Sequence, residues 1–82
     1  MRDQLPDKFN VDQAVQDVVR MRNSQVRQQV IYNYSEYIYN CCKTMQGVQH
    51  FMEMCQAAEP ELDTQLLQEF NRAINRLTDW KN

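Results

Sequence analysis

The feature that most constrains this chain is a run of apolar residues spaced three and four positions apart. It consists of Ile31, Tyr34, Ile38, Cys41, Met45, Val48, Met52 and Cys55. This is the a/d pattern of a helix that buries one stripe. At about 1.5 Å per residue the stripe is roughly 37 Å long. Only shorter segments remain to cover it, so the sequence predicts a helical module that self-associates.

Length and charge narrow the possible functions. The chain has 82 residues, 43% of them hydrophobic and 24% charged, which is typical of one small globular domain that oligomerisation often stabilises. A net charge of −2 argues against a general nucleic-acid binder and against a basic membrane-surface protein. No membrane span or signal peptide is recognisable. We therefore expect an intracellular protein, cytoplasmic or nuclear, with no membrane contact.

Capping residues indicate where the first helix begins and ends. We expect residues 1–9 to form a flexible lead and residues 10–82 to form a single helical domain. Asn10 is a plausible N-cap, with Gln13 completing a capping box, so a first helix should span about 11–22. Asn23 and Ser24 are weak helix formers, and we place a turn there. The alternative is one unbroken helix from Val11 to Ala57, because the apolar spacing continues through this segment.

The remaining boundaries give two more helices. We expect the long apolar run to lie on one helix of about 24–58, since Gly47 interrupts the composition but not the register. Glu59-Pro60 should end this helix and start another of about 60–80, with Leu67 and Ile74 beside its main apolar face. The predicted fold class is all-α. It is a three-helix bundle with a long central helix, completed by helix–helix dimerisation.

The sequence contains no catalytic, cofactor or metal signature. Cys41, Cys42, His50 and Cys55 are the only candidate soft-metal ligands, but one helix cannot bring them together at the spacing that zinc sites use. An odd number of cysteines on one helix is typical of reduced thiols. A helical bundle with one glycine also offers few backbone amides for an oxyanion hole. We therefore predict that the protein is not an enzyme and has no small-molecule substrate.

Tyrosine and methionine are the residues that indicate a partner. The four tyrosines between positions 32 and 39 point nearly all round a helix, so some of them should lie at an interface, where tyrosine is enriched. The alternative is that two are core residues and the others are ordinary surface residues. The predicted protein-binding residues are Tyr32, Tyr34, Tyr37, Ile38, Cys41, Met45 and Met52. The partner would be a second copy of the chain or a helix of another protein.

Three arginines support a different hypothesis. Arg20, Arg22 and Arg27 form the one basic cluster, in which Arg20 and Arg27 are a heptad apart and so share a helix face. Such a stripe can touch phosphates in a small dimeric transcriptional or nucleic-acid-associated regulator. Stripes of this kind are more often solvated faces screened by nearby acids. Nucleic-acid contact is therefore the alternative function and protein interaction the leading one.

Overall fold

The computed structural model describes residues 9–81, and side chains as far as residue 79. Its elements in chain order are α1 (Val11–Val19), α2 (Ser24–Cys42), α3 (Gln46–Ala58), the 3-10 turn η1 (Pro60–Leu62) and α4 (Asp63–Lys81). The predicted all-α class is confirmed. The predicted flexible lead lies outside the described residues except for Phe9, which packs against the helices through contacts with Tyr34 and Phe51.

Two asparagine caps fix the starts of the first and second helices. Asn10 Oδ1 accepts the backbone N–H of Gln13 at 3.1 Å, which confirms the predicted N-cap. The predicted capping box is only half formed, because the Gln13 side chain donates to Asp17 Oδ1 at 3.0 Å instead of reaching back to Asn10. Asn23 Oδ1 accepts the N–H groups of Gln25 and Val26 at 2.9 and 3.1 Å. The turn predicted at Asn23–Ser24 is therefore confirmed and an unbroken helix from 11 to 57 is wrong. Helix α1 ends at Val19, earlier than the predicted 22.

The predicted long central helix over 24–58 is wrong, and the fold has four helices instead of three. Helix α2 ends where Lys43 adopts a left-handed conformation with φ 62°, and the Lys43 N–H donates to the carbonyl of Tyr39 at 2.7 Å. Helix α3 starts again at Gln46, so the break does not fall at Gly47, which is buried in its first turn. The break lets both halves of the apolar run fold onto one shared core, which a straight helix cannot do within a single chain.

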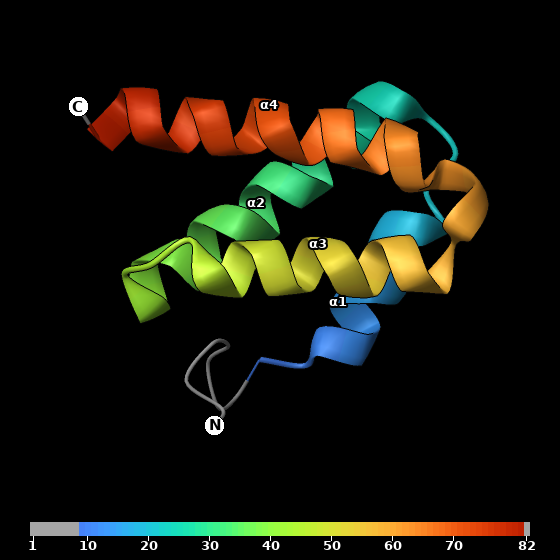
Figure 1. Cartoon of the computed structure of the whole chain (residues 1–82), viewed down its shortest axis with the longest axis horizontal. Helices are drawn as coiled ribbons and strands as arrows, with labels where there is room; N and C mark the ends of the chain where they lie inside the picture. The colour runs from blue at the N-terminus through green and yellow to red at the C-terminus, as the bar shows by residue number, and fades with distance from the viewer. Residues whose placement is uncertain (1–8, 82) are drawn as a thin grey trace.

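The corner predicted at Glu59-Pro60 is confirmed. Pro60 opens the 3-10 turn, and α4 then runs back beside α3 in the opposite direction (Figure 1). The start of α4 is at Asp63, a few residues later than predicted, because the chain turns the corner in the 3-10 geometry first.

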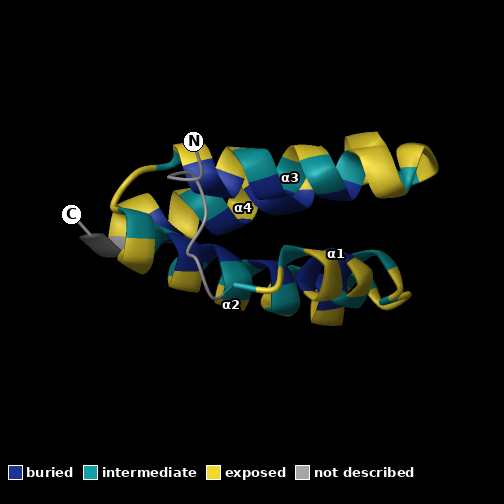
Figure 2. Cartoon of the chain, turned by 90° about the horizontal axis from the view of Figure 1, so that it is seen from below, coloured by how far each residue is buried: buried dark blue, intermediate teal, exposed yellow. Residues whose placement is uncertain are grey.

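The helices pack in two layers around one core. Helices α3 and α4 lie side by side, and α1 and α2 cover one face of this pair (Figures 1 and 2). Buried residues form a stripe along the inner side of each helix (Figure 2). Phe51 of α3 and Phe70 of α4 meet edge to face at the centre, with ring centroids 5.6 Å apart. The outer face of the α3–α4 layer is left without a covering helix among the described residues.

Candidate interaction surfaces

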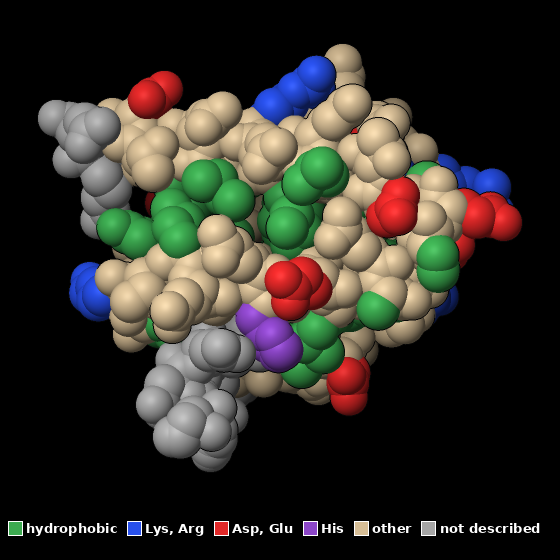
Figure 3. Space-filling model, in the orientation of Figure 1, with side chains coloured by type: hydrophobic (Ala, Val, Ile, Leu, Met, Phe, Trp, Pro, Cys, Tyr) green, Lys and Arg blue, Asp and Glu red, His purple; other side chains and the backbone are tan. Residues whose placement is uncertain are grey.

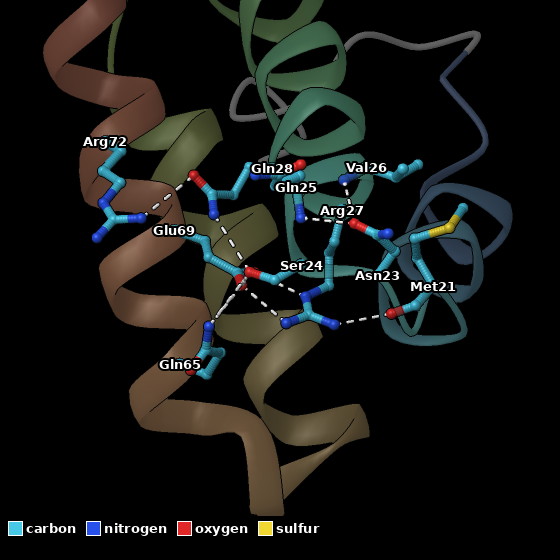
Figure 4. A network of polar contacts seen from close by, with 10 residues as sticks. All are labelled: Met21, Asn23, Ser24, Gln25, Val26, Arg27, Gln28, Gln65, Glu69 and Arg72. Carbon is cyan, nitrogen blue, oxygen red and sulfur yellow. Dashed lines mark hydrogen bonds and ion pairs between the residues drawn. The ribbon is translucent and has the colours of Figure 1, made fainter.

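A buried ion pair joins the start of α2 to the middle of α4 (Figure 4). Arg27 Nε donates to Glu69 Oε1 and Arg27 Nη2 donates to Glu69 Oε2, both at 2.7 Å. The two residues are 5% and 1% exposed. Arg27 Nη1 also donates to the Met21 carbonyl at 2.8 Å, which ties the α1–α2 turn to the same group. A bidentate pair with this many hydrogen bonds positions three segments at once.

The Glu69 carboxylate accepts further hydrogen bonds at the same place. Ser24 Oγ donates to Glu69 Oε2 at 2.8 Å, and Gln65 Nε2 donates to the same oxygen at 2.9 Å (Figure 4). Burial by itself raises the pKa of Glu69, but the hydrogen bonds from Arg27, Gln65 and Ser24 outweigh it and the pKa lies below its ordinary value. The carboxylate is therefore ionised at neutral pH.

This pair removes one residue from the predicted basic stripe. Arg27 is buried, so the placement of Arg20, Arg22 and Arg27 on one solvated face is wrong, because a heptad spacing says nothing about a partner on α4. Arg20 and Arg22 are exposed. Together with the buried Arg27 they line a shallow hollow of about 650 Å³, in which Glu59 and Glu61 also lie. Nucleic-acid contact through these two arginines stays a prediction, and the acidic residues beside them weaken it.

The predicted tyrosine surface divides between two sides of α2. Tyr32 faces α4, where the Arg76 guanidinium carbon lies 4.1 Å from its ring centroid. Tyr34 faces α1 and donates its hydroxyl hydrogen bond to Asp17 Oδ2 at 2.6 Å. This bond lowers the pKa of Asp17 and raises that of Tyr34. The two side chains therefore hold helices together on opposite sides and do not belong to one patch.

Tyr37 and Phe9 extend the core to the surface on the α1 side. The Phe9 ring lies 5.7 Å from that of Tyr34, 5.8 Å from that of Tyr37 and 6.0 Å from that of Phe51. Tyr37 is 46% exposed. The Cys41 thiol beside it raises the pKa of the Tyr37 phenol. Tyr37 and Cys41 are thus neighbours on the surface, as their predicted role in partner binding requires.

The other predicted partner residues differ in how deeply they are buried. Ile38 is fully buried in the core and is closed to a partner in this conformation. Met45 and Met52 are partly buried and pack at the edge of the core. They are seven residues apart at the start and in the middle of α3, so they lie on one side of it.

Met45 and Met52 border a surface to which α4 also contributes. Leu67 and Ile74 are likewise seven residues apart, and they lie on the edge of α4 that is turned away from the Glu69–Arg76 side facing α2. Leu67 is 42% exposed and Ile74 is partly buried. Figure 3 shows hydrophobic side chains gathered along the line between α3 and α4. We call Met45, Met52, Leu67 and Ile74 the α3–α4 patch.

Sequence reasoning placed Leu67 and Ile74 beside the main apolar face of the last helix but did not assign them to a partner. The signal that identifies them is their place beside the buried stripe of α4. Met45 and Met52 lie in the same way beside the buried residues of α3. This signal becomes meaningful only when α3 and α4 are known to be neighbours.

The three cysteines differ in burial, and burial changes the reactivity of a thiol. Burial raises the pKa of the Cys55 thiol to about 12, which makes it a poor nucleophile. Cys41 is exposed and Cys42 is partly buried. Among the described side chains, no three His, Cys, Asp or Glu residues come together in a way that could hold a metal ion.

Comparison with known proteins does not place the chain in a family, since no protein-family model, curated protein or solved structure matches it. Within residues 9–81, no helix combines the length and the apolar character needed to cross a membrane.

Proposed function

We propose that this chain is a non-catalytic protein-interaction module that forms a homodimer through the α3–α4 patch. The observation that carries the proposal is the partly exposed row of Met45, Met52, Leu67 and Ile74 on the uncovered face of the α3–α4 layer. Methionine-rich helical surfaces adapt well to a packed helix. Two such faces, related by a two-fold axis, would bury each other.

The size of this face suits a stable dimer. The molecule measures 29 × 28 × 17 Å, and α3 and α4 lie on one of its two broad faces (Figures 1 and 2). A face of about 800 Å² is what each partner contributes to a standard protein interface. A thin two-layer molecule also leaves much of its apolar surface near solvent, and a second copy on this face would add two further helices to cover it.

The border of the patch favours a second copy over a strongly charged partner. Gln49 and Glu53 of α3 and Asp63, Asn71 and Thr78 of α4 are exposed at positions next to the patch. Glu53 and Asp63 are the charged residues among these five. Two identical faces can therefore approach without burying many like charges, which would otherwise cost stability.

Sedimentation equilibrium tests the proposal directly. The monomer has a mass of 9.9 kDa, and we expect the wild-type protein in reducing buffer to approach twice this mass as its concentration rises. Leu67→Glu should weaken the dimer by tenfold or more, since a charge at the centre of an apolar contact costs about 1.4 kcal/mol or more.

Val26→Glu is the matched control. Val26 is 44% exposed, close to the 42% of Leu67, but it lies on α2 in the other layer. It should leave the dimer unchanged, and circular dichroism should find both variants as helical as the wild type. A wild-type protein that stays monomeric up to about 1 mM, or equal losses from the two variants, would show that the patch is not a dimer interface.

A further inference from the structure

The break between α2 and α3 divides the chain into two halves that hold each other together. The first half contains α1 and α2, and the second contains α3, η1 and α4. Most of the notable side-chain contacts cross between them: Arg27 with Glu69, Ser24 with Glu69, Tyr32 with Arg76, Tyr34 with Phe51 and Phe9 with Phe51. Each half therefore supplies the surface against which the other half buries its core side chains.

The hinge between the halves is short and locally strained. Only Lys43, Thr44 and Met45 separate the two helices. Lys43 has φ 62°, a conformation that costs a residue with a Cβ about 1 kcal/mol or more. Helix α3 receives no side-chain cap from Met45. Contacts elsewhere in the molecule therefore stabilise the folded-back hairpin, because the hinge has no turn residues that favour it.

The sequence of the hinge fits a straight helix equally well. The apolar run keeps its three-four spacing through Cys41, Met45 and Val48, and no glycine or proline falls at Lys43–Met45. A helix over residues 24–58 would remove the left-handed Lys43 and close the hydrogen bonds missing at the break. It would be about 50 Å long and would carry the first half away from its own second half.

We propose that the chain exchanges halves with a second copy. In the exchanged dimer, α2 and α3 of each chain form one continuous helix, and the first half of each copy packs on the second half of the other. Every contact across the halves, including the Arg27–Glu69 pair, is made again between chains. The closed and exchanged forms then differ in structure only at the hinge, and the protein concentration decides which of them predominates. These are the conditions for domain swapping. This exchange goes beyond the patch dimer and needs none of its contacts.

A charge-reversal experiment distinguishes exchange from surface contact. One chain carries Arg27→Glu and the other carries Glu69→Arg, and both carry Leu67→Glu to remove the patch. Each chain alone places like charges in the buried pair and is unstable. In an exchanged heterodimer, one lobe pairs the two substituted residues and the other pairs the two native ones, so both lobes regain an ion pair. A heterodimer of closed chains regains none.

The two chains are mixed in denaturant, refolded together and examined by native mass spectrometry and thermal unfolding. We expect a one-to-one heterodimer whose Tm exceeds that of either chain alone by about 10 °C or more. The control replaces the Glu69→Arg chain with one that carries Arg72→Glu, an exposed change on α4 that cannot restore the pair. A mixture that unfolds as the sum of its separate chains, or a heterodimer without the gain in Tm, overturns the proposal.

Discussion

At the scale of single residues, the Arg27–Glu69 pair decides how the first and second halves of the chain meet. A buried charge that loses its partner costs about 3 to 5 kcal/mol, a large fraction of the stability of a small domain. The pair is satisfied by Ser24, Gln65 and the Met21 carbonyl as well as by its own two bonds. Its contribution to stability therefore depends on all of these groups and on pH.

We predict that acid weakens the fold through Glu69. The pKa of Glu69 is lower in the folded protein than its ordinary value of 4.5, which applies to the unfolded chain. The pair therefore stabilises the fold fully above about pH 5, and this stability is lost as the pH falls through the folded pKa. Urea denaturation between pH 7 and pH 3 should show a larger loss for the wild type than for the double variant Arg27→Met, Glu69→Leu.

The double variant is the useful control because apolar replacement of a whole buried pair is often tolerated. The single variant Glu69→Gln should instead lose about 3 kcal/mol or more at pH 7, since it leaves the Arg27 charge without its carboxylate. Equal pH dependence in the wild type and the double variant would contradict the role given to Glu69.

At the scale of helices, the sequence predicted the elements but not the way the central one divides. Asn10, Asn23 and Pro60 are local signals: the cap predicted at Asn10, the turn predicted at Asn23–Ser24 and the corner predicted at Pro60 are present. The break at Lys43 has no such signal, because lysine is a good helix former and the apolar spacing runs through it. The contacts that hold the chain in its bent form, such as Tyr34 with Phe51 and Arg27 with Glu69, are made between residues far apart in the sequence. For the same reason Arg27 was assigned to a surface and Ile38 to an interface.

We predict that Lys43→Gly stabilises the closed fold. Glycine adopts a φ of 62° without the cost that a Cβ imposes, and this gain exceeds the added entropy of the unfolded chain. The free energy of unfolding in urea should rise by about 0.5 kcal/mol. Asn40→Gly, an exposed change inside α2, should lower it by a similar amount. A loss of stability in both variants would mean that Lys43 is not strained.

At the scale of the whole molecule, burial separates the three cysteines by their reactivity. Cys55 is fully buried and its thiol has a pKa of about 12, whereas Cys41 is exposed. Reaction of Cys55 with iodoacetamide thus requires the helices to separate. With a typical stability near 5 kcal/mol, the unfolded fraction is on the order of one in several thousand.

We predict that Cys55 is alkylated about 1,000-fold more slowly than Cys41 at pH 8. The measurement follows each site by mass spectrometry in matched variants that keep one cysteine, with serine at the other two positions. Added urea should accelerate the Cys55 reaction along the global unfolding curve. Similar rates for the two sites in the absence of urea would show that α3 opens locally.

The distance along the chain between Arg27 and Glu69 also sets an order of events during synthesis. The two residues are 42 positions apart, which a ribosome adding 5 to 20 residues per second covers in roughly 2 to 8 s. Helices α1 and α2 are complete once Cys42 has been added, whereas α4, which completes their core, begins only at Asp63. The nascent first half therefore has an uncovered apolar stripe until α3 and α4 follow, and its final packing depends on these later helices.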